Sequence, residues 1–126
     1  MKDEQYKNEL LSAWEETYKK GQLTFWIFLA LRESPKYVSE IRGFIENSTR
    51  GVITCEEQSL YRSLRKFYDL EMVDFDTGKG NKGPDRKYYS LTALGEELLA
   101  EFIERNINLL YYDELKKLIT GEKRND

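Results

Sequence analysis

The chain contains no histidine, one cysteine and two prolines among its 126 residues. Histidine is the commonest metal ligand and a frequent general base, so its absence removes the usual catalytic triads and most metal sites. The single Cys55 permits neither an internal disulfide nor a cluster of thiolate ligands. We therefore expect no enzyme activity, no cofactor and no metal centre.

Long apolar runs are missing too. The longest, FWIFLAL at 25–31, is far too short to cross a bilayer, and the N-terminal MKDEQYKNE has no signal-peptide core. These features predict a cytoplasmic protein. A composition that is 40% hydrophobic and 13% aromatic predicts one folded domain, 1–126. The net charge of −3 argues against indiscriminate coating of nucleic acid, but it permits a local basic patch.

Apolar spacing predicts three helices in the first part of the chain. An N-terminal helix over 1–20 carries an apolar stripe at every fourth position, and Gly21 ends it. The segment 22–33 is apolar on nearly all sides, as in a helix at the centre of a small core, and Ser34-Pro35 stops it. A third helix follows over 37–48. The stripe of the first helix consists of Tyr6, Leu10, Trp14 and Tyr18.

A fourth helix is predicted from about Cys55 to about Asp69. Thr54 and Glu57 have the spacing of a capping box, in which the two side chains cap each other's backbone amides. One face of this helix is apolar, with Leu60, Leu64 and Phe67. The opposite, polar face carries Gln58, Arg62, Arg65 and Asp69, flanked by Ser59 and Lys66.

A hairpin and a last helix complete the chain. MVDFD at 72–76 alternates apolar and acidic residues, and RKYYSL at 86–91 can pair with it across a glycine-rich loop that contains Lys79 and Lys82. Thr92 is the predicted N-cap of a helix over 93–120, and 121–126 is a tail. The apolar stripe of this helix consists of Leu94, Leu98, Phe102, Leu109, Leu110, Leu115, Leu118 and Ile119.

The predicted helices over 22–33, 37–48 and about 55–69 are followed by a hairpin, and the last of these three helices has a basic face. This order of elements indicates a mainly α (α+β) winged helix-turn-helix over 21–92. The helix over 1–20 precedes it and a dimerisation helix over 93–120 follows. An α-helix fits the major groove of DNA, where arginine and glutamine read guanine and adenine edges. The hairpin is then a wing whose basic tip can reach the phosphate backbone.

Four segments, SPKYVSEI, SLYRSLRKF, LEMVDF and GPDRKYYSLTALG, occur in the order and at the separations of the PadR family of winged-helix transcriptional regulators. The chain resembles that family over about 21–100. The resemblance implies a homodimeric repressor that binds a palindromic operator and is released by an effector, in some members an aromatic acid or a drug. Two segments depart from the family pattern, Tyr37-Val38-Ser39 and Glu57-Gln58-Ser59. They start the two helices that would approach DNA, so they bear on operator sequence more than on fold.

The DNA-contact candidates come from two helices and the wing, and exposed charged residues could instead form a solvated face. Tyr61 could pack inward. The candidates are Tyr37, Ser39, Gln58, Ser59, Tyr61, Arg62, Arg65, Lys66, Lys79, Lys82, Arg86 and Lys87.

Dimerisation is expected independently of the resemblance, because the first and last helices carry more apolar surface than a three-helix core can cover. A two-fold dimer would place two recognition helices roughly one DNA turn apart. The dimerisation candidates are Tyr6, Leu10, Trp14, Leu98, Phe102, Leu109 and Leu110.

Three further alternatives stay open at this stage. Trp14 and Phe25 could line a pocket for a small aromatic effector or could simply pack. Cys55, placed in the first turn of the fourth helix, would have a pKa lowered by the helix dipole, or it could be an inert small side chain. Finally, the net acidity and Glu56-Glu57-Gln58 favour a rival function, a winged-helix protein interaction module that does not bind DNA.

Overall fold

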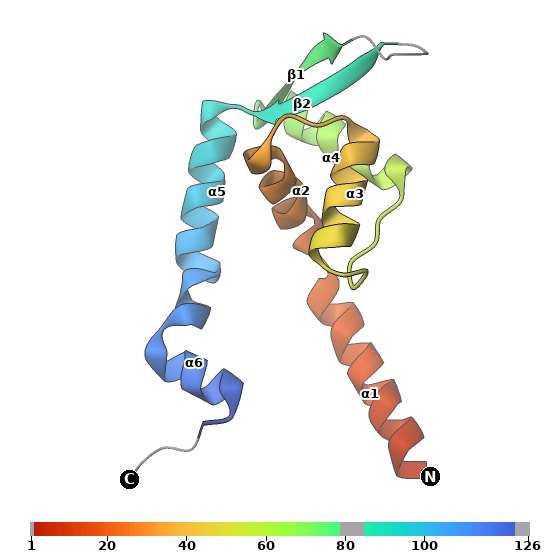
Figure 1. Cartoon of the computed structure of the whole chain (residues 1–126), viewed down its shortest axis with the longest axis vertical. Helices are drawn as coiled ribbons and strands as arrows, with labels where there is room; N and C mark the ends of the chain where they lie inside the picture. Colours follow the sequence, from red (N-terminus) through yellow and green to blue (C-terminus); the bar gives the residue numbers. More distant parts are fainter. Residues whose placement is uncertain (1, 79–84, 123–126) are drawn as a thin grey trace.

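The structure is a computed structural model that describes residues 2–78 and 85–122 (Figure 1). No helix in those ranges is long and apolar enough to cross a membrane. The elements in chain order are α1 (Lys2–Lys19), α2 (Gln22–Glu33), α3 (Val38–Ser48), α4 (Glu57–Asp69), β1 (Val73–Gly78), β2 (Arg86–Leu91), α5 (Ala93–Asn106), η1 (Asn108–Tyr111) and α6 (Asp113–Thr120).

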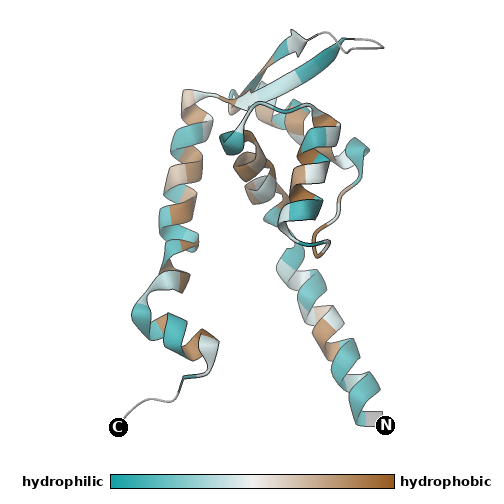
Figure 2. Cartoon of the chain, in the orientation of Figure 1, coloured by the Kyte–Doolittle hydropathy of each residue, from teal (hydrophilic) through white to brown (hydrophobic). Residues whose placement is uncertain are grey.

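The core lies between α2, α3 and α4, and the hairpin lies across one end of these helices (Figure 1). Ile27 of α2, Ile41 and Ile45 of α3, and Leu60 and Leu64 of α4 are fully buried. The apolar faces predicted for these helices are therefore the ones that pack, because removing such side chains from water is the main favourable contribution to folding. Figure 2 shows hydrophobic residues concentrated on α2 and on the inner side of α3.

The boundaries of the first three helices agree with the sequence prediction to within about two residues. Gly21 has a φ of 83°, the left-handed conformation that separates α1 from α2. Ser34 is extended and ends α2. The Glu40 carboxylate accepts a hydrogen bond from the Tyr37 backbone N–H at 3.2 Å, which fixes the start of α3.

The predicted start of the fourth helix is wrong. α4 begins at Glu57, its N-cap is Glu56, and no side chain caps it. Ile53 and Cys55 both pack against the core. In an extended segment, side chains two residues apart point to the same side. The packing of Ile53 and Cys55 therefore keeps the chain extended through Thr54 and prevents the Thr54–Glu57 capping box.

The hairpin is antiparallel and runs in register from Val73 opposite Leu91 to Gly78 opposite Arg86. β1 ends two residues beyond the predicted strand. The segment between α2 and α3 joins the sheet through Lys36, whose backbone N–H donates to Tyr89 O at 3.0 Å and whose carbonyl accepts from Tyr89 N at 2.8 Å. Because Tyr89 is also buried in the core, the hairpin is fixed to the helices at this point.

The single last helix over 93–120 is also a wrong prediction. Thr92 caps α5 as expected, with its hydroxyl accepting from Gly95 N at 3.1 Å, but α5 ends at Asn106. Asn106 and Asn108 have low helix propensity, and the Asn106 side chain donates to Phe102 O at 3.1 Å. The chain then passes through η1 and turns into α6, where Asp113 and Glu114 suit a new helix N-terminus.

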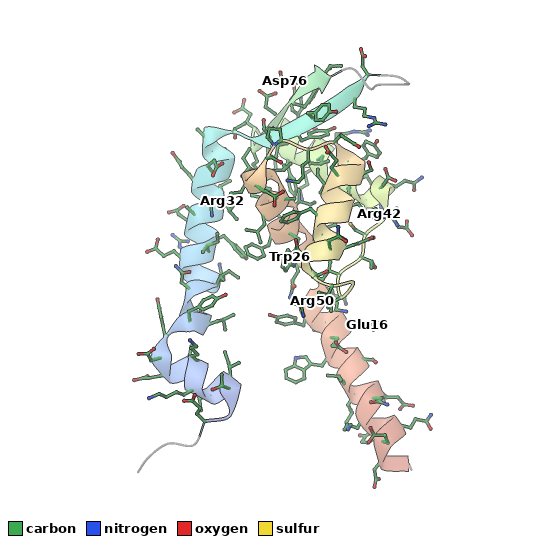
Figure 3. The ribbon with its side chains drawn as sticks, viewed as in Figure 1. Glu16, Trp26, Arg32, Arg42, Arg50 and Asp76 are labelled. Carbon is green, nitrogen blue, oxygen red and sulfur yellow. The ribbon has the colours of Figure 1, made fainter. Side chains whose placement is uncertain are left out.

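α1 leaves the winged helix at the end opposite the hairpin, whereas α5 begins beside the hairpin and runs, with α6 after it, toward the same side as α1 (Figure 1). α5 is attached by Leu99, which is 2% exposed, and by an ion pair of 3.8 Å between Arg32 and Glu96. Figure 3 shows Arg32 on the side of α2 nearest α5. The other large apolar side chains of α1, α5 and α6 are mostly exposed, including Trp14 at 72% and Phe102 at 45%.

Candidate nucleic-acid interface

A groove of about 690 Å³ lies between the start of α3, the outer side of α4 and the hairpin. Its walls come from three separate stretches of the sequence, 37–39, 57–75 and 85–89, which the winged-helix fold brings together. Six of the twelve predicted DNA-contact residues line it: Tyr37, Ser39, Tyr61, Arg65, Arg86 and Lys87.

The remaining candidates have different positions. Gln58, Arg62 and Lys66 are exposed on α4 beside the groove. Ser59 is half-buried and lines a separate hollow together with Arg42 and Cys55. Lys79 and Lys82 lie outside the described residues.

The basic side chains of α4 are available for an external partner. Arg62, Arg65 and Lys66 are all exposed, and none of them is in an ion pair within residues 2–78 and 85–122. The inner face of the same helix buries Leu60, Leu64 and Phe67. This division between a packed side and a cationic side is the one the helical spacing predicts.

Tyr61 is 50% exposed and lines the groove, so it does not pack fully inward. Burial raises the pKa of the neighbouring Tyr89 hydroxyl, proximity to Tyr61 raises it further, and the Arg65 guanidinium opposes the rise. The Tyr89 phenol is therefore protonated at neutral pH. It lines the groove and can serve as a hydrogen-bond donor there.

The two basic residues at the start of β2 lie over aromatic rings. The Arg86 guanidinium carbon is 4.4 Å from the ring centre of Tyr37, and Lys87 Nζ is 4.5 Å from that of Phe75. Such contacts hold long, flexible cations in place without neutralising them. Both side chains remain exposed.

Two acidic residues also line the groove, Glu57 in the first turn of α4 and Asp85 just before β2. Arg42 of α3, labelled in Figure 3, lies 3.1 Å from a Glu46 oxygen and 3.8 Å from a Glu57 oxygen. The hydrogen bond that Arg42 Nε donates to the Glu46 carboxylate raises the pKa of Arg42, so this guanidinium stays charged and partly offsets the Glu46 and Glu57 carboxylates.

Of the two alternatives for Cys55, the structure does not favour the reactive thiol. Cys55 precedes the N-cap of α4 rather than lying in its first turn, so it does not have the predicted position relative to the helix dipole. Burial raises the pKa of the Cys55 thiol, Glu46 raises it further, and Arg42 lowers it. The thiol is therefore protonated at neutral pH, which favours the inert role.

Lys36 is a buried residue that sequence reasoning missed. Its side chain is 8% exposed, and Nζ donates to Ala30 O at 2.7 Å, Glu33 Oε1 at 2.9 Å and Ser34 Oγ at 3.0 Å. The ammonium thereby caps the C-terminus of α2, where free carbonyls favour a cation. A lone lysine after Pro35 carries no sequence pattern that would have predicted this role.

The two effector candidates are not paired within the described part of the chain. Phe25 is half-buried, with its ring centre 5.7 Å from that of Trp26 and 5.5 Å from that of Phe102. Trp14 lies on α1 and is 72% exposed. Beside Phe25, the buried Nε1 of Trp26 has no acceptor among the described residues.

The sequence model of the "Transcriptional regulator PadR-like family" matches residues 27–101. An uncharacterized protein from Lysinibacillus sphaericus is 29% identical over 85 residues, covering 68% of this chain and 78% of that protein.

Solved structures share the fold. A PadR family transcriptional regulator from Eggerthella lenta matches with a TM-score of 0.70 and 23% identity, covering 95% of this chain and 99% of that one. Bacillus subtilis PadR in complex with operator DNA matches with a TM-score of 0.61 and 20% identity over 66% of this chain. The match spans 46% of the Bacillus subtilis protein.

Proposed function

Since the chain belongs to the PadR-like family of transcriptional regulators, we propose that it binds operator DNA as a homodimer and represses transcription. The observation that carries this proposal is the continuity of two cationic surfaces. The exposed side of α4, with Arg62 and Lys66, adjoins the groove that contains Arg65, Arg86 and Lys87. A duplex lying along α4 would meet both surfaces at once.

In this proposal α4 enters the major groove. Arg62 and Arg65 read guanine edges, and Gln58 reads adenine, because these side chains offer matching pairs of donors and acceptors. Ser39 approaches the duplex from the start of α3, Tyr37 lines the groove wall beside it, and Tyr61 and Lys66 flank α4. Ser59 is the weakest of the predicted contacts, since it is half-buried on another side of the helix.

The wing supplies phosphate contacts. Arg86 and Lys87 are exposed and held in place at the loop end of the hairpin, where a duplex backbone would run beside α4. Lys79 and Lys82 belong to the same hairpin in sequence and add positive charge to it. Backbone contacts of this kind fix the register of the protein on DNA and make its affinity depend on salt.

A second copy of the chain is the proposed cover for the exposed apolar surfaces of α1, α5 and α6. Exposed apolar surface of this extent, on helices that project from the core, is typical of an interface. Two-fold pairing of the terminal helices would bury Tyr6, Leu10, Trp14, Leu98, Phe102, Leu109 and Leu110. It would also present two α4 helices to a palindromic site.

A small aromatic effector is the proposed release signal. Phe25 and the unpaired Trp26 N–H offer an aromatic surface beside a donor, and Trp14 from the second copy could complete the site. A regulator of this kind acts on the chromosome in the cytoplasm.

The decisive test starts with selection of bound duplexes from a random-sequence pool. Replacement of Arg65 by alanine should weaken binding to the selected duplex about tenfold or more, since a bidentate base contact is worth roughly 1–3 kcal/mol. Arg105→Ala is the matched control, because Arg105 is an exposed arginine of α5 far from α4. The affinity of this variant for the selected duplex should be unchanged. Recovery of no specific duplex, or equal affinity in Arg65→Ala, would contradict the proposal.

One observation favours the rival role as a protein interaction module without DNA binding. Glu56 and Glu57 are exposed at the start of α4, and Glu57 lines the groove, where it would repel phosphate. Salt separates the two functions. DNA affinity should fall steeply between about 50 and 200 mM salt, whereas an apolar protein interface should respond little.

A further inference from the structure

Arg86 belongs to a small stack of side chains at the loop end of the hairpin, which we call the wing clamp and define as Tyr37, Arg86 and Tyr88. The Arg86 guanidinium lies over the Tyr37 ring at 4.4 Å. The Tyr88 ring meets the same Tyr37 ring edge to face, with centres 5.4 Å apart and planes at 86°. The start of α3 is therefore joined to β2 through one shared ring.

The backbone beneath the wing clamp is fixed. Gly78 lies opposite Arg86 in the hairpin, and a Cβ there would lie 2.5 Å from a ring carbon of Tyr88. Glycine thus lets the Tyr88 ring lie across the end of β1. The next residue of β2, Tyr89, is held by its two backbone hydrogen bonds to Lys36, which is adjacent in sequence to Tyr37. Both sides of the clamp are therefore anchored to the domain.

Within residues 2–78 and 85–122, no carboxylate forms an ion pair with Arg86. The Tyr37 ring is then the contact that orients the guanidinium. Attraction to a ring face leaves the full positive charge in place, and it does not use up the five N–H donors as a carboxylate partner would. Arg86 is exposed and keeps its capacity to bind an anion.

We propose that Tyr37 is a positioning residue that acts on DNA through Arg86, rather than through its own hydroxyl. It holds the guanidinium at the groove wall in the orientation that donates to a backbone phosphate. An arginine ordered in advance loses less side-chain freedom on binding, so affinity rises without a further contact. The inference rests on the proposed DNA-binding function.

A double-mutant cycle tests the inference on the duplex recovered by selection, with affinity measured over a range of salt. Tyr37→Phe keeps the ring and should bind as the wild type does. Tyr37→Leu removes the ring and should weaken binding about threefold. Arg86→Ala should lower the slope of log affinity against log salt by about 0.9, the value for one phosphate. Adding Tyr37→Leu to Arg86→Ala should cause no further loss.

Two results would overturn the positioning role. One is Tyr37→Phe binding as weakly as Tyr37→Leu, which would assign the contact to the hydroxyl. The other is an additive loss in the double variant, which would make Tyr37 independent of Arg86. If Tyr37→Leu does not fold, as judged by its thermal melt, the affinity of Tyr37→Phe decides alone.

Arg65→Ala separates this inference from the proposed function. If the wild type selects no duplex, or Arg65→Ala binds equally well, DNA binding itself fails. A different outcome is that Arg65→Ala loses affinity while the losses of Tyr37→Leu and Arg86→Ala are additive in the double variant. In that case the protein binds DNA and only the positioning role of Tyr37 fails.

Discussion

Lys36 joins three parts of the molecule at one residue. Its ammonium caps α2, its backbone pairs with Tyr89 of β2, and Tyr37 of the wing clamp follows it directly. Burying a charge is costly unless its donors are satisfied. Here the ammonium donates to the Ala30 carbonyl, the Glu33 carboxylate and the Ser34 hydroxyl, and these hydrogen bonds offset the cost of burying the charge.

Lys36→Met should lower the free energy of unfolding by about 1–3 kcal/mol, because it keeps the packed stem but removes the charged donor that lies 2.7 Å from the Ala30 carbonyl, which then accepts only the 3.5 Å bond from Ser34 N. Urea denaturation followed by circular dichroism measures the change. Lys116→Met, at an exposed position of α6, is the control and should shift stability by less than about 0.5 kcal/mol. Equal stability in the two variants would show that the buried ammonium contributes nothing.

At the scale of elements, the junction between β1, β2 and α5 depends on Thr92. Its hydroxyl accepts from Gly95 N at 3.1 Å and donates to Glu71 O at 2.7 Å, so one side chain caps α5 and ties it to the turn before β1. Glu71 has a φ of 62°, an unfavourable conformation for a residue with a side chain. The bond from Thr92 helps to hold that conformation.

Thr92→Ala should destabilise the protein by about 1–2 kcal/mol, the usual cost of losing an N-cap side chain. Thr92→Ser retains the hydroxyl and should restore most of the loss. Chemical denaturation of both variants gives the comparison. A serine variant as unstable as the alanine variant would attribute the effect to the lost methyl group instead of the hydrogen bonds.

At the scale of the whole molecule, the winged helix buries its apolar side chains in one core, whereas the projecting helices leave most of theirs exposed. The apolar side chains of α2, α3 and α4 are packed, whereas Tyr6, Trp14, Leu118 and Ile119 are each more than 60% exposed. Burying such side chains is worth roughly 25 cal/mol for each Å² removed from water. The proposed dimer would gain this contribution, and it would also set the separation of the two α4 helices.

Trp14→Glu should shift the protein from dimer to monomer, raising the dimer dissociation constant about tenfold or more, since a charge would replace a large apolar contact. Sedimentation equilibrium measures the change. Val52→Glu is the matched control, because Val52 is 58% exposed in the loop between α3 and α4, apart from the projecting helices. A wild-type monomer, or an undisturbed Trp14→Glu dimer, would exclude the proposed interface.

Sequence alone determined the features that depend on local spacing. Helical periodicity placed Leu60, Leu64 and Phe67 inside and Arg62 and Arg65 outside, alternation placed the first strand with RKYYSL as its partner, and Thr92 marked the start of α5. These signals are strong because a helix or strand repeats side-chain direction at a fixed interval. The same spacing supported the winged-helix prediction before any contact was known.

Tertiary structure decided what depends on contacts between distant segments. Packing of Ile53 and Cys55 overrode the capping pattern at Thr54, so α4 begins at Glu57. The buried ammonium of Lys36 and the stacking of Arg86 on Tyr37 involve partners that no local pattern connects. Local propensity is worth a fraction of a kcal/mol per residue, so burial and packing prevail where the two conflict.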